Sequence, residues 1–197
     1  MTLSPLESGV NLIFTPDTRS SLVMTADMVN TLPGTASPDV DGLVDLADLS
    51  AYLQVHPYSG TIRLDAAELE AIRRIRPRLR ELWTLDRDSA VPVVNEMLHD
   101  SNAVPRLVRH DAYDWHIHAT PDDGPLADRI LIEAAMAFVD VIRADAYERI
   151  RVCSADDCGA VYVDFSRNGS KRYCDTGNCG NRMNVNAYRQ RKAQESG

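Results

Sequence analysis

The chain has 197 residues, of which 44% are hydrophobic and 25% charged, the composition of a globular protein with a buried core. Its formal net charge of −8 argues against a protein that binds nucleic acid over its whole surface. No apolar run approaches the ~20 residues that cross a bilayer, and the first residues lack the basic and then apolar pattern of a secretory signal. We therefore expect a cytoplasmic protein with no membrane partner.

Apolar residues recur at helical spacing through most of the chain that precedes the cysteines. The clearest case is 65–85, which places Leu69, Ile72 and Ile75 on one face, while Pro77 inside it predicts a kink or a break into two helices. Six helices and one β-hairpin are expected. The helices span 20–32, 43–55, 65–85, 91–98, 126–147 and 181–192, and the two strands span 106–108 and 115–119.

The second strand of this hairpin contains His116 and His118, which point to the same face. Two imidazoles on one face could bind a metal ion or a small-molecule effector. The simpler interpretation is an ordinary solvated face, with Trp115 and Ile117 buried on the opposite side. Carboxylates that would complete a ligand set are close in the sequence: Asp111 and Asp114.

The helix expected over 126–147 is apolar almost all round its centre, ILIEAAMAFV. Such a helix is either the central helix of the core or part of a homodimer face. It leads almost directly into the first cysteine, so we expect a helical domain over 1–148 and a second, smaller domain over 149–197.

All four cysteines lie in one short window, as two C-x4-C pairs separated by fifteen residues. Positions i and i+5 sit ~140° apart around a helix, so each pair must lie on a turn. Four thiolates with this spacing indicate a closed structural zinc site, with two disulfides or an iron–sulfur cluster as the alternatives. The ligands would be Cys153, Cys158, Cys174 and Cys179.

The end of the chain is basic although the whole is acidic. Seven lysines and arginines against two acidic residues give +5 over 165–197, so the preceding 164 residues carry −13. Some of these cations flank the cysteines, where they would offset the charge of a four-thiolate zinc site. The candidate DNA-binding residues are Arg167, Lys171, Arg182, Arg189, Arg191 and Lys192.

The run from Cys153 to Arg182, C-x4-C-G-x-V-Y-V-D-x-S-R-N-x-S-K-R-Y-C-x4-C-G-N-R, resembles the CGNR zinc finger. DMVNTL at 27–32 and LREL at 79–82 resemble segments of the ABATE domain that precedes this finger. The resemblance implies a mostly α protein: a helical domain with a short hairpin, followed by a treble-clef-like finger with one structural Zn²⁺. It also implies a stress-linked, DNA-binding transcription regulator whose N-terminal domain senses a ligand or forms a homodimer.

Other candidate sites have simpler interpretations. Asp27 and Asn30, one helical turn apart, would bind a ligand or make helix-end hydrogen bonds. Five arginines within 73–80 indicate a salt-bridged solvent face rather than a phosphate site. No nucleophile motif or P-loop is present, so we do not expect an enzyme. The alternative to a DNA-binding regulator is a protein- or ligand-binding module, which the acidity and the absence of a lysine after CGNR favour.

Overall fold

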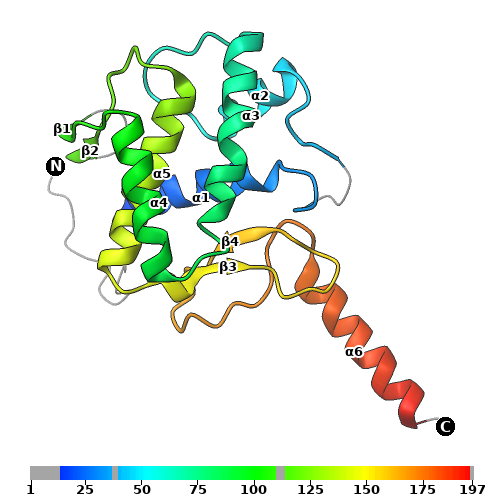
Figure 1. Cartoon of the computed structure of the whole chain (residues 1–197). Coiled ribbons are helices and arrows are strands. Elements are labelled where there is room, and N and C mark those ends of the chain that lie inside the picture. The colour runs from blue at the N-terminus through cyan, green and yellow to red at the C-terminus, as the bar shows by residue number, and fades with distance from the viewer. Residues whose placement is uncertain (1–13, 37–39, 110–113, 196–197) are drawn as a thin grey trace, which may run out of the picture.

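One helix, α5 (Leu126–Arg143), forms the centre of the fold and packs against α1, α3 and α4 (Figure 1). The computed structural model describes residues 14–36, 40–109 and 114–195. Within these ranges the chain is mostly α-helical, as the sequence predicts, with two two-stranded antiparallel sheets, one more than the single hairpin expected. The other elements are α1 (Pro16–Asn30), α2 (Leu46–Val55), α3 (Ala66–Glu81), α4 (Arg87–Asp100), β1 (Arg106–Val108), β2 (His116–His118), β3 (Ile150–Val152), β4 (Val161–Val163) and α6 (Cys179–Glu195).

The apolar residues of α5 are buried in the core of the same chain. Ile130, Ile132 and Phe138 are fully buried, and the Phe138 ring stacks edge-on against Trp83 with centroids 5.2 Å apart. Of the two interpretations of this helix, the structure therefore supports the central core helix.

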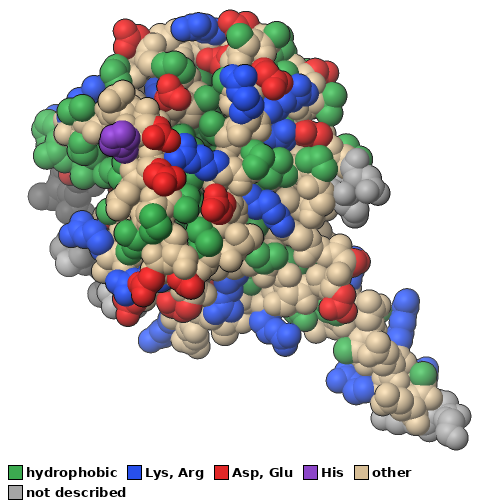
Figure 2. All heavy atoms as spheres, viewed as in Figure 1, with side chains coloured by type: hydrophobic (Ala, Val, Ile, Leu, Met, Phe, Trp, Pro, Cys, Tyr) green, Lys and Arg blue, Asp and Glu red, His purple; other side chains and the backbone are tan. Residues whose placement is uncertain are grey.

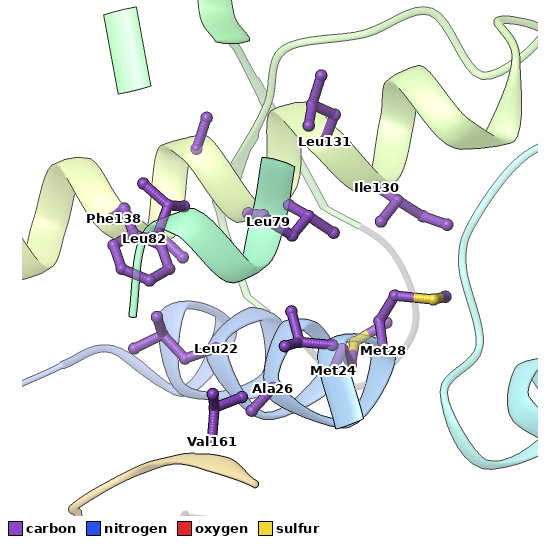
Figure 3. Packing of buried hydrophobic residues seen from close by; sticks show 14 of the residues in the cluster. Leu22, Met24, Ala26, Met28, Leu79, Leu82, Ile130, Leu131, Phe138 and Val161 are labelled. Carbon is purple, nitrogen blue, oxygen red and sulfur yellow. The ribbon is translucent and has the colours of Figure 1, made fainter. Parts of the chain in front are cut away.

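α1 lies between two layers, with α3 and α5 on one side and β4 on the other (Figure 3). Leu22 and Met28 are fully buried in this position, and Val161 of β4 reaches the same core from the far side. α1 begins four residues earlier than expected, since Pro16 in its first turn already has the helical φ.

Side-chain caps set the starts of the next helices. Asp45 accepts from the backbone of Ala47 and Asp48 and completes a capping box, so α2 starts later than the apolar spacing indicates. Asp86 caps α4 through the N–H of Ser89. α3 runs through Pro77 as one helix, so the break expected there does not occur; buried Ile72 and Leu79 hold the helix on both sides of the proline.

The arginines of α3 make specific bonds rather than a simple salt-bridged surface. Arg76 is buried and forms a bidentate pair with Asp41, with both N–O distances 2.7 Å. Arg73 donates from Nε to the carbonyl of Leu43 at 2.7 Å. Two salt bridges match the expectation: Arg78 with Asp100 and Arg73 with Glu70.

The two small sheets lie in different parts of the molecule. β1 and β2 pair near one end of α4 and α5, whereas β3 and β4 lie beneath α1 and lead toward α6 (Figure 1). The main core includes Ile150, Val161 and Val163, so it continues past the expected domain boundary at 148. None of the helices in the described ranges has both the length and the apolarity that a membrane span requires.

Candidate metal centre and projecting basic helix

The four cysteines converge from four places in the finger. Cys153 follows β3, Cys158 ends the turn between β3 and β4, Cys174 follows a long loop, and Cys179 is the first residue of α6. All four are free thiols, and their Sγ atoms lie within 4.8 Å of one another. The expected placement of each pair on a turn is confirmed.

The distances between sulfurs fit one tetrahedral metal ion. Sγ of Cys174 lies 3.8 Å from Sγ of Cys158 and 3.6 Å from Sγ of Cys179. A tetrahedron with Zn–S bonds of about 2.3 Å has edges of about 3.8 Å. A disulfide requires about 2.05 Å, and thiolates on different irons of a cluster lie farther apart because iron and sulfide intervene. The set therefore suits one structural zinc, closed by four sulfurs.

Burial raises the pKa of the Cys153 thiol when no metal is bound. It raises the pKa of the Cys158 thiol to about 12. A zinc ion that binds here must therefore displace a proton. Two donors reach the sulfurs from within the finger: the Cys174 N–H lies 3.5 Å from Sγ of Cys153, and Nη2 of Arg182 lies 3.2 Å from Sγ of Cys179.

A buried carboxylate shapes the loop that carries Cys174. Asp164 has no exposed surface, and its two oxygens accept from the backbone N–H groups of Ser166 and Lys171, each at 2.8 Å. Burial opposes the charge, but these hydrogen bonds outweigh it and hold the pKa of Asp164 below its usual value. Arg151 fixes the same loop by donating to the carbonyls of Gly169 at 2.8 Å and Lys171 at 3.1 Å.

The finger is fastened to the helical part by side chains that bond to its backbone. Asn30 makes two hydrogen bonds with Val161, and Nε1 of Trp83 donates to the carbonyl of Tyr162 at 3.1 Å. Arg80 donates to the carbonyl of Gly159 at 3.1 Å. A Cβ at position 159 would lie 2.3 Å from the carbonyl oxygen of Gly34, so only glycine permits this close approach.

Two of the six candidate DNA-binding residues have partners inside the finger. Arg182 pairs with Asp157, with one N–O distance of 3.1 Å, in addition to its contact with Cys179. Nζ of Lys171 lies 2.5 Å from Asp175 and above the Tyr162 ring. Nothing in the sequence linked Asp157 to Arg182, because they are 25 positions apart and no spacing rule connects them.

The other four candidates are exposed. Arg167 lies on the loop after β4, and α6 carries the other three along a helix that projects from the body (Figures 1 and 2). Every residue from Asn184 to Gln194 is exposed. Figure 2 shows basic side chains on this helix and mixed acidic and basic side chains over the body. The three residues are Arg189, Arg191 and Lys192.

The histidine hairpin is turned the opposite way from the simpler expectation. Trp115 is 62% exposed and Ile117 47%, whereas His116 is only 8% exposed, so the expected burial of Trp115 and Ile117 is wrong. Alternation shows which residues share a face, but not which face meets the core. Nδ1 of His116 lies 2.8 Å from the Asp114 carbonyl, and its Nε2 lies 3.1 Å from Nε2 of His118. Asp111 lies outside the described residues.

Both histidines line a cavity of about 990 Å³ bounded by α1, the end of α2 and the segment after it, β2 and α5. Its acidic residues from α5, Glu133 and Asp140, were not singled out from the sequence, where they lie in an otherwise apolar helix. Asp27 does not line this cavity and pairs with Nε2 of His56 at 3.1 Å. Asn30 bonds to β4, so it serves neither a helix end nor this cavity.

Comparison with known families agrees with this geometry. Residues 149–192 match the CGNR zinc finger, and residues 23–145 match the ABATE family, described as "Putative stress-induced transcription regulator". No curated protein matches the chain significantly. Neither matching family is an enzyme family. The chain therefore belongs to the ABATE family and ends in a CGNR zinc finger with four cysteines that suit one structural zinc.

Proposed function

We propose that the protein is a cytoplasmic DNA-binding transcription regulator in which the zinc-stapled finger presents α6 to the duplex. The observation that carries this proposal is the exposure of α6 from Asn184 to Gln194, in a helix with four basic residues and one acidic residue. A helix that buries so little of its surface gains little from packing against its own chain. Contact with a polyanion would use that surface.

The distribution of charge along α6 suits a groove with phosphates on both walls. Arg189 and Lys192 are three positions apart and share a face, whereas Arg191 lies about 200° from Arg189 around the axis. A helix lying in the major groove would thus direct cations toward both strands. Arg167 would add a contact from the preceding loop. Arg182 and Lys171, which have acidic partners in the finger, would act mainly on the finger itself.

The test is a titration of fluorescently labelled duplex DNA, followed by anisotropy at several salt concentrations. Wild type should bind, and its affinity should fall with salt because bound cations release counterions from DNA. Arg189→Glu/Arg191→Glu should abolish most of this binding.

A matched control keeps the charge change and moves it to the body. Arg63→Glu/Arg74→Glu alters two exposed arginines of the helical part and should leave the affinity within about threefold of wild type, because these positions lie outside α6. No binding by wild type at low salt, or an equal loss in the control, would retire the DNA proposal and leave a binding module with a structural zinc.

The cavity supports a second role for the helical part, the sensing of a small molecule. Its volume of about 990 Å³ falls at the upper end of the range of ligand sites.

The helical part could also form a homodimer, which would place two fingers on one duplex. Sedimentation velocity in the presence and absence of duplex would measure the oligomeric state directly.

A further inference from the structure

The cavity is acidic. Its described lining residues include four carboxylates and three imidazoles but no lysine or arginine, so its formal charge is −4 with neutral histidines. The carboxylates come from α1, from the segment before α5 and from α5 itself. They are Asp17, Asp122, Glu133 and Asp140.

The contacts of Asp122 and Asp140 leave at least part of the negative charge of the cavity in place. Asp122 lies 3.1 Å from Nη2 of Arg106, so its charge is partly offset. Asp140 accepts from the hydroxyl of Thr18 at 2.6 Å, a neutral donor that does not cancel the charge. An anionic ligand entering the cavity would meet this repulsion, whereas a cation would be attracted.

Apolar side chains form the remainder of the wall. Met24 comes from α1, Val55 from the end of α2, and Met136 and Ala137 from α5. A single metal ion would leave most of a space of about 990 Å³ unfilled. Among the described residues, the cysteine set is the sole group of three or more donors close enough to hold an ion.

The inverted hairpin is a second, independent sign of a ligand site. Burying His116 while Trp115 stands in solvent reverses the usual preference of these residue types and costs stability. Departures of this kind from the local rules are expected at functional sites. Here the inversion directs both imidazoles into the cavity wall.

We propose that this cavity binds an organic ammonium ion with an apolar body. The carboxylates would attract the cationic head, and the methionine-rich wall would cover the rest. This inference rests on the proposed ligand-sensing role and gives it a chemical class. It is independent of DNA binding, because no residue of α6 lines the cavity.

The experiment measures the melting temperature of the full-length, zinc-loaded protein at constant ionic strength. The probes are 2-phenylethylammonium and three comparison compounds at equal concentration: 2-phenylethanol, 3-phenylpropanoate and spermidine. A ligand of the native state raises the melting temperature in a saturable way. We expect 2-phenylethylammonium to do so, and the alcohol, the carboxylate and the purely hydrophilic polyamine to have much smaller effects.

Paired variants locate the binding site. Ile117→Lys adds a cation at an exposed position in the lining and should weaken the binding of 2-phenylethylammonium at least tenfold. Its control is Leu107→Lys, directly across the hairpin, which is exposed and outside the lining. Asp17→Asn/Glu133→Gln should weaken binding similarly, and Glu81→Gln/Asp88→Asn changes the net charge equally outside the cavity.

Three results would overturn the proposal: no saturable rise with 2-phenylethylammonium, an equal rise with the carboxylate, alcohol or spermidine, or an equal loss in the control variants. The DNA titration is a separate measurement. Loss of ammonium binding with DNA binding intact would sink this inference alone, and the reverse result would sink the DNA proposal alone.

Discussion

The side chain of Asn30 takes the place of a neighbouring strand beside Val161. Its Nδ2 donates to the Val161 carbonyl at 2.9 Å, and its Oδ1 accepts from the Val161 N–H at 2.8 Å. These two bonds join the last residue of α1 to the edge of β4, 131 positions later in the chain.

Asn30→Ala should destabilise the protein by about 2 kcal/mol, because it leaves a buried N–H and a buried carbonyl without partners. Urea unfolding followed by circular dichroism measures this change. Asn95→Ala, at an exposed position of α4, is the control and should change the free energy of unfolding by less than about 0.5 kcal/mol. Equal effects of the two substitutions would contradict the role of Asn30.

Asp41→Asn should cost about 3 kcal/mol at pH 7, since it leaves the buried guanidinium of Arg76 without its counter-charge. Asp100→Asn breaks the exposed pair with Arg78 and should cost less than about 1 kcal/mol. Free energies of unfolding of the three proteins give both values.

The same pair predicts a pH dependence. The hydrogen bonds from Arg76 hold the pKa of Asp41 below its ordinary value. The stability that Asp41 contributes is therefore complete above the ordinary carboxyl pKa of about 4 and fades as pH falls through the lower folded value. The difference between wild type and Asp41→Asn should narrow in acid; a constant difference from pH 7 to pH 3 would refute this account.

Cys174→Ser should lose the zinc and loosen residues 149–195, while the helical core around α5 persists. Metal analysis should give about one zinc per wild-type chain, and hydrogen exchange should show where protection is lost. In wild type, zinc should be released as pH falls, because protons compete for the thiolates. Full zinc content in the variant would contradict the assignment of Cys174 as a ligand.

Arg182→Ala should speed the transfer of zinc to a chromophoric chelator several-fold, because it removes the cation beside Sγ of Cys179. Arg189→Ala, on the same helix but away from the sulfurs, should leave the transfer rate unchanged. If both variants release zinc at the wild-type rate, Arg182 does not stabilise the thiolate.

Local sequence patterns predicted the zinc site and the existence of the helices well. Ligand spacing and turn residues carry that information within a short window around Cys153 and Cys174. The pairing of β1 with β2 also follows from local alternation. The outward turn of Trp115 does not, because alternation alone cannot say which face of a strand is buried.

The roles of some polar residues were predicted wrongly for a different reason: their partners lie far away in the sequence. Arg76 is buried because Asp41 lies 35 positions earlier, and Asn30 has its role because β4 passes beside it. No periodicity records such contacts. Likewise, the acidic cavity could not be predicted, because its lining residues come from α1, β2 and α5, which are far apart in the sequence.

A single helix about 22 Å long, α1, contacts both the acidic cavity and the zinc finger. Asp17 in its first turn and Met24 at its middle line the acidic cavity, and the side chain of its last residue, Asn30, bonds to β4 of the finger. Because the helix is continuous, a tilt imposed by a ligand at its first turn would be carried to Asn30 at its other end. Repositioning of the finger on its target would then require a small rotation of α1 and no unfolding.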